Sequence, residues 1–117
     1  MNNITVDELY KSIALNILQN IDSNHASWEK AFIEVERDAD DAIELGGGYT
    51  LGNNFSSFDF REFDRRIIKD FHMLHKITTD NNSNLWNKAR YTLYPDGKFD
   101  IKFEWDQSLA DEIEANS

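Results

Sequence analysis

The residues with the most distinct chemistry are six carboxylates in EVERDADDAIE, residues 34–44. If Arg37 pairs with Asp41 around a three-residue loop, Glu34 lies directly across a hairpin from Glu44. Two like charges that face each other on paired strands destabilise the hairpin unless a nearby cation neutralises them. We therefore predict an acidic hairpin tip that attracts a basic protein partner. Its predicted contact residues are Glu34, Glu36, Asp38, Asp40, Asp41 and Glu44. The alternative is a solvated edge strand, whose charges keep sheets from joining edge to edge.

Two histidines offer a second kind of chemistry. His72 and His75 are three residues apart in a segment of helical period, so both can face one side and bind a divalent metal. Zinc enzymes of the usual kind carry two histidines four residues apart around a glutamate, which this pair lacks. Histidines on a helix surface are the ordinary interpretation. We predict that the protein is not an enzyme and binds neither a metal nor a cofactor. The alternative is a small metal- or ligand-binding enzyme that uses His72 and His75.

The glycine run Gly46-Gly47-Gly48 and the serine pair Ser56-Ser57 carry weaker signals. Glycine lets backbone amides approach a phosphate, but this run lacks the lysine and the closing Ser or Thr of a nucleotide-binding loop. A bulge within a strand is the better prediction for it. The serines have no histidine close by in sequence, so they give no sign of a catalytic triad.

The net charge of −10, from 12 basic and 22 acidic residues, limits the kinds of partner. Residues 1–45 and 79–117 hold the excess acid, whereas residues 46–78 are nearly neutral. Nucleic-acid binding normally needs a basic patch, and anionic membranes attract basic segments. We therefore predict a basic protein as the partner, and neither a nucleic acid nor a membrane. The chain has no cysteine, which excludes disulfides and thiolate metal sites.

The elements that must position the acidic segment can be predicted from periodicity. Before the final hairpin they are a helix of roughly 16 residues from Thr5, strands at 27–37 and 41–51, a loop at 52–57, and a helix at 59–77. Thr5 and Glu8 fit a capping box at the start of the first helix. Glu62 and Arg66 are spaced as an ion pair one turn apart on the second.

The segment ARYTLYPDGKFDIKFEWD, residues 89–106, predicts a second hairpin. Its turn is Pro95-Asp96-Gly97, in which Gly97 takes the left-handed conformation. Pairing Tyr94 with Lys98 sets one apolar face, on which the pairs are Leu93 with Phe99, Tyr91 with Ile101, and Ala89 with Phe103. That face needs a cover, which the two helices supply. The tail at 107–117 carries a short helical turn or frays.

Together these elements predict one α+β domain over residues 1–117. Each hairpin and each helix buries one apolar face. The economical arrangement is a four-stranded antiparallel sheet with two helices packed on one face, in the order α-β-β-α-β-β, with the strand order left open. The N-terminus lacks the basic segment and apolar run of a signal peptide, so we expect a cytoplasmic protein.

The final hairpin and the tryptophan before it also carry a family resemblance. The residues concerned are Trp86, Pro95-Asp96-Gly97, Phe99, Ile101, Phe103, Trp105 and Asp106. In these the chain resembles the YezG-like family of bacterial immunity proteins, antitoxins of polymorphic nuclease toxins, which usually have tyrosine in place of Trp105. The resemblance implies one-to-one binding of a cognate toxin, expected to be a nuclease, in competition between bacteria. It implies no catalysis and leaves the oligomeric state open. Nucleases are basic where they grip nucleic acid, which suits an acidic inhibitor.

Overall fold

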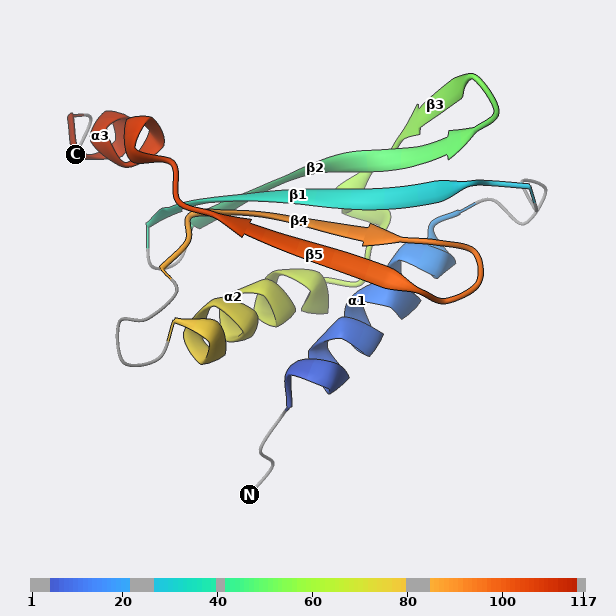
Figure 1. Cartoon of the computed structure of the whole chain (residues 1–117), viewed down its shortest axis with the longest axis horizontal. Helices are drawn as coiled ribbons and strands as arrows, with labels where there is room; N and C mark the ends of the chain where they lie inside the picture. The colour runs from blue at the N-terminus through green and yellow to red at the C-terminus, as the bar shows by residue number, and fades with distance from the viewer. Residues whose placement is uncertain (1–4, 22–26, 40–41, 80–84, 116–117) are drawn as a thin grey trace.

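Five strands form one antiparallel sheet, and two helices cover one of its faces (Figure 1). This computed structural model describes residues 5–21, 27–39, 42–79 and 85–115. The strands are β1 (Lys30–Ala39), β2 (Ala42–Leu51), β3 (Asn54–Ser57), β4 (Lys88–Leu93) and β5 (Phe99–Glu104). Their order in the sheet is β3-β2-β1-β4-β5. The helices are α1 (Val6–Gln19), α2 (Arg66–Thr78) and α3 (Gln107–Ala115).

The predicted α+β class and single antiparallel sheet are confirmed, but the prediction of four strands and two helices is wrong. The segment predicted as a loop at 52–57 contains β3, because Gly52 takes a φ of 61° and turns the chain back onto β2. The tail forms α3, because the side chain of Asp106 accepts a hydrogen bond from the Leu109 N–H and caps its first turn. Strand β3 is too short to show a clear period in the sequence, whereas α3 is the helical one of the two outcomes predicted for residues 107–117.

The first helix begins as the sequence predicts. Thr5 Oγ1 accepts a hydrogen bond from the Glu8 N–H at 3.2 Å, and the Thr5 N–H donates to Glu8 Oε2 at 3.4 Å. This capping box starts α1, which ends at Gln19 after 14 residues. Ile13 and Ile17 lie fully buried against the sheet. Burying a side chain of this size stabilises the fold by about 1.5–3 kcal/mol.

The second helix begins later than predicted. A short 3₁₀ helix, η1 (Phe60–Glu62), comes first, because the side chain of Asp59 accepts a hydrogen bond from the Arg61 N–H. Phe63 is then extended, and α2 begins at Arg66. The predicted pairing of Glu62 and Arg66 on one helix is therefore wrong. The Arg66 guanidinium lies instead 3.9 Å from the carboxylate of Asp70, one turn further along α2.

The register of the final hairpin is confirmed residue by residue. Leu93 pairs with Phe99, Tyr91 with Ile101, and Ala89 with Phe103. The Tyr94 N–H donates to the Lys98 carbonyl at 2.9 Å, and Gly97 closes the turn with a φ of 89°. The predicted cover is also confirmed, since the buried Tyr91 donates its hydroxyl hydrogen bond to the Tyr10 carbonyl of α1.

The hydrophobic core fills the space between the sheet and the pair α1 and α2. Its fully buried side chains include Ile33 from β1, Tyr91 from β4, Phe71 and Leu74 from α2, and Trp86 just before β4. The opposite face of the sheet, which we call the outer face, presents the alternate residues of each strand to solvent. In the described part of the chain, no helix is long and apolar enough to cross a membrane.

Candidate functional site

The outer face carries two pairs of opposite charge across β1 and β4. Glu34 lies beside Arg90 in the register, with Oε1 3.6 Å from Nη1. Glu36 lies beside Lys88, with Oε1 3.6 Å from Nζ. The Arg90 guanidinium also sits 4.3 Å from the centre of the Phe32 ring. Because these side chains are solvent-exposed, each ion pair contributes at most about 1 kcal/mol.

The register of the acidic hairpin differs from the prediction. Glu36 pairs with Glu44, and Glu34 pairs with Gly46. The prediction that Glu34 faces Glu44 is therefore wrong. The reason is that β1 continues to Ala39, which pairs with Ala42, so the chain turns later than a three-residue loop after Arg37 would require. The slip is an even number of residues, which leaves the carboxylates on the outer face.

The structure places three of the six predicted contact side chains. Glu34 and Glu36 are partly neutralised by Arg90 and Lys88 of the same chain, which reduces their field toward a partner. Glu44 is exposed. The side chain of Asp38, and all of Asp40 and Asp41, lie outside the described residues.

Helix α3 adds carboxylates that sequence reasoning missed. It packs against β1 and stands beside the end of the sheet where β1 leads into β2 (Figure 1). Asp111 and Glu112 on it are exposed, as is Glu44, which pairs with Glu36 of β1 from its place on β2. We call Glu36, Glu44, Asp111 and Glu112 the acidic end of the sheet. The sequence signal for α3 was the spacing of Leu109 and Ile113, which are four residues apart among acidic residues and so share one face of a helix.

A hydrogen-bonded corner holds α3 at this end. The side-chain amide of Asn87 donates to the Asp106 carbonyl at 2.9 Å and accepts from the Asp106 N–H at 2.7 Å. Asp106 Oδ2 lies 2.8 Å from Lys88 Nζ. The hydrogen bond from Lys88, together with the Leu109 N–H, lowers the pKa of Asp106, and the same contact raises the pKa of Lys88. Asp106 and Lys88 therefore both stay charged at neutral pH, and their ion pair helps to hold this corner in place.

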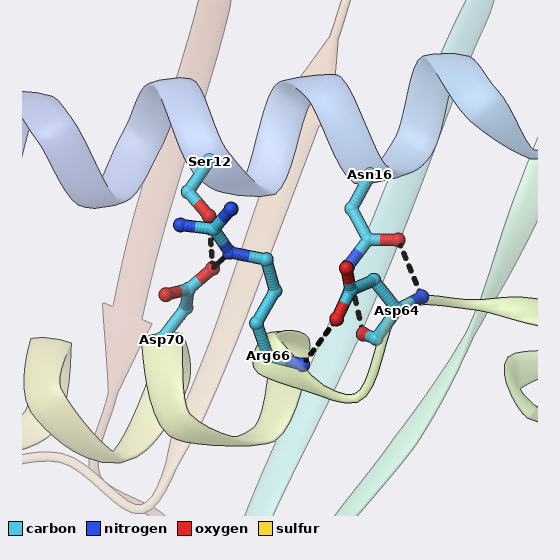
Figure 2. A network of polar contacts seen from close by, with 5 residues as sticks. All are labelled: Ser12, Asn16, Asp64, Arg66 and Asp70. Carbon is cyan, nitrogen blue, oxygen red and sulfur yellow. Dashed lines mark hydrogen bonds and ion pairs between the residues drawn. The ribbon is translucent and has the colours of Figure 1, made fainter.

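The same arrangement joins the two core helices (Figure 2). The side-chain amide of Asn16 donates to the Asp64 carbonyl at 2.9 Å and accepts from the Asp64 N–H at 3.0 Å. Asp64 Oδ1 in turn accepts from the N–H of Arg66, the first residue of α2. One turn away, Ser12 donates its hydroxyl hydrogen bond to Asp70. These contacts align α1 and α2 under the sheet, so they serve the scaffold.

Asp70 is the buried carboxylate of this network, and only 7% of it is exposed. Burial raises its pKa, and the hydrogen bond from Ser12 and the charge of Arg66 oppose that shift only in part. The charged form therefore costs folding free energy at neutral pH. This cost is complete above the folded-state pKa and vanishes as the pH falls below the unfolded value of about 3.9.

We expect Asp70→Asn to be at least as stable as the wild type at pH 7, because the amide oxygen still accepts from Ser12 and no buried charge remains. The advantage over the wild type should shrink as the pH falls toward 4, where Asp70 takes up its proton in the folded state. Urea unfolding of both proteins at pH 7 and pH 4 measures the difference. A variant that loses more stability at pH 7 than at pH 4 would show instead that the ion pair with Arg66 dominates.

The histidines predicted as the alternative site have structural contacts. His75 Nε2 lies 3.1 Å from the Trp86 carbonyl, and the two rings meet edge to face with centroids 4.7 Å apart. His72 is half-buried on α2. Among the described residues, no group of three His, Asp or Glu side chains is arranged to hold a metal ion. No contact in the described part of the chain favours the alternative of a small enzyme at these histidines.

The glycine run lies within β2, and the bulge predicted there is wrong. Its register against β1 is continuous, and the irregularity falls between Arg37 and Ala39. Glycine is required for close approach: a Cβ on Gly47 would lie 2.1 Å from the Phe32 carbonyl oxygen, and one on Gly48 would lie 2.7 Å from the Phe55 ring. Phe55 thereby reaches Phe32 on the outer face, with ring centroids 5.8 Å apart.

Comparison with known proteins adds no relative. No protein-family model matches the chain, and no curated protein matches it. The resemblance to the YezG-like family therefore stays a prediction that rests on Trp86 and the residues of the final hairpin.

Proposed function

We propose that this protein is an immunity protein, which binds a cationic toxin domain in the cytoplasm and neutralises it without performing chemistry itself. The observation that carries the proposal is that exposed carboxylates stand on β2 and on α3, and that both elements meet β1 at the same end of the sheet. The toxin is expected to be a nuclease, since a nuclease must present positive charge to its substrate. An acidic surface can cover that charge or bind beside it.

The exposed acids of this end suit attraction over a distance. Glu44, Asp111 and Glu112 lie on different elements, so they can present a field together only because the sheet and α3 are held in place. Charges of this kind mainly raise the association rate and suppress wrong partners, and salt screens them beyond about 8–10 Å. We therefore propose that the acidic end attracts the partner before contact and so speeds its association.

The ion pairs on the outer face have a smaller role in the proposal. Glu34 and Glu36 already have cationic neighbours at 3.6 Å, so an incoming arginine or lysine has to compete with Arg90 or Lys88. Such exposed pairs are weak, and the competition is possible at small cost. The predicted contact surface thus shifts toward the turn side of the hairpin and toward α3.

The proposal is tested by finding a toxin domain encoded in a neighbouring gene, which the proposal requires, and by producing the chain together with it. Cells that make both proteins should survive, and the two should purify as a one-to-one complex by light scattering. The purified chain alone should show no nuclease activity. Death of the cells despite full expression of both proteins, or failure of the purified proteins to associate at low salt, would contradict the proposal.

A further inference from the structure

Strand β5 forms one border of the sheet. Half of its backbone N–H and C=O groups point away from β4, toward the open side. Lys98 and Glu104 direct their carbonyls toward the β4 side, where they accept hydrogen bonds from the N–H groups of Tyr94 and Asn87. Backbone groups alternate in direction along a strand. The N–H and C=O groups of Phe99, Ile101 and Phe103 therefore point to the open edge. Within the described ranges, no further strand follows β5 in the sheet.

The same residues leave apolar surface uncovered along this edge. Phe99 is 43% exposed, Phe103 37% and Trp105 49%. Each of the two phenylalanines is held from the inside, since the Phe99 ring lies 4.9 Å from Tyr10 and the Phe103 ring 5.1 Å from Trp86. The two phenylalanine rings are thus held in position, and part of each ring remains exposed to solvent. An open edge with exposed aromatic residues is a template for another strand.

The sequence of the edge is complementary to itself when read in reverse. In KFDIKFE, residues 98–104, an antiparallel second copy centred on Ile101 places Lys98 opposite Glu104, Phe99 opposite Phe103, and Asp100 opposite Lys102. Each of these pairs occurs twice because of the two-fold symmetry. In the described part of the chain, neither Asp100 nor Lys102 has an ion-pair partner. Glu104 lies opposite Lys88 in the register, and its charge acts on Lys88 without a contact short enough for an ion pair. Asp100, Lys102 and Glu104 are all exposed on the outer face.

Neighbouring registers lack this complementarity. Centring the pair on Lys102 would set Lys102 against Lys102 and Asp100 against Glu104. Centring it on Asp100 would set Asp100 against Asp100 and Lys98 against Lys102. Like charges directly opposite each other are destabilising, whereas opposite charges and aromatic pairs stabilise the pairing. Ile101 also directs its own N–H and C=O outward, so two copies can exchange both hydrogen bonds at the symmetry axis.

We propose that the edge of β5 is the contact surface for a second copy of this chain, with Ile101 at the two-fold axis. The two sheets then continue into one sheet of ten strands, and the outer faces of both copies remain open. In this register Trp105 of one copy lies opposite Gly97 of the other, where glycine leaves room for the ring. Seven residue pairs form a small interface, and interfaces below about 1,200 Å² are typical of reversible association.

The charge pairs give the test. Sedimentation velocity over a range of concentrations should show a reversible dimer for the wild type. Lys102→Glu sets two acids against each other on each side of the axis, and Asp100→Lys sets two cations against each other. Each single variant should weaken dimerisation at least about ten-fold, and the double variant Asp100→Lys/Lys102→Glu should restore it, because its charges are again opposite. Both positions are exposed, so all three variants should melt like the wild type.

Glu62→Lys is the matched control, because Glu62 is exposed on η1, away from the edge, and its reversal should leave the dimer unchanged. A wild type that stays monomeric at the highest concentrations would overturn the proposal and would leave the edge to a strand of another protein. A dimer that survives both single reversals would also overturn it, because the contact would then lie on another surface.

Discussion

Trp86→Ala is expected to lower the free energy of unfolding by about 3–5 kcal/mol, a large part of the total for a domain of this size. Trp86 is only 2% exposed, and its ring packs against Phe103 of β5 and His75 of α2. Its Nε1–H also donates to Thr78 Oγ1 at 2.8 Å. The change therefore opens a cavity and leaves the half-buried Thr78 hydroxyl without one of its partners.

Trp105→Ala is the matched control, because it removes the same side chain from an exposed position. Trp105 is half-exposed and donates only to Gln107 Oε1 in its own segment. We expect it to cost less than about 1 kcal/mol, since surface substitutions usually have small effects. Urea unfolding, followed by circular dichroism, compares the two variants. Equal losses would mean that Trp86 is not the contact that joins α2 to the final hairpin.

Reversing charge at the acidic end is expected to slow association with the cationic toxin domain by about ten-fold or more at low ionic strength. The variant is Glu44→Lys/Glu112→Lys, which changes one exposed residue on β2 and one on α3. Neither residue is buried, so the variant should keep the wild-type unfolding free energy. The dissociation rate should change less than the association rate, because these charges act mainly before contact.

Its matched control is Glu29→Lys/Glu62→Lys, which changes the net charge by the same amount away from this end. Glu29 directly precedes β1, whose start lies at the end of the sheet away from α3 (Figure 1). Glu62 lies on η1. If steering depends on where the carboxylates lie, the control should slow association far less. If it depends only on net charge, the two variants should be equally slow.

Local signals were sufficient for much of the fold. The capping box at Thr5 and the turn at Gly97 each depend on residues close in sequence, so both could be predicted with their hydrogen-bond partners or pairing register. The start of α2 could not, because it depends on Asn16, which binds the backbone of Asp64 from another helix. Strand β3 depends likewise on the space above Gly48, which only the folded sheet defines.

The candidate surface was harder to predict than the fold, for a related reason. The acidity of residues 34–44 is plain in the sequence, but their neighbours Lys88 and Arg90 come from a strand about 50 residues later. The sequence therefore overstates the field of Glu34 and Glu36. It understates the contribution of α3, whose acids come about 70 residues after the hairpin in sequence and are brought to it by the corner at Asn87 and by the packing of α3 on β1.

The most direct test of the central claim is the salt dependence of the association rate with the toxin domain, measured by stopped flow. The account predicts that the wild type and Glu29→Lys/Glu62→Lys associate faster as salt is lowered, with similar steep slopes, and that Glu44→Lys/Glu112→Lys has a much shallower slope. A wild-type rate that does not change with salt, or equal slopes for all three proteins, would contradict the claim that the acidic end guides the partner.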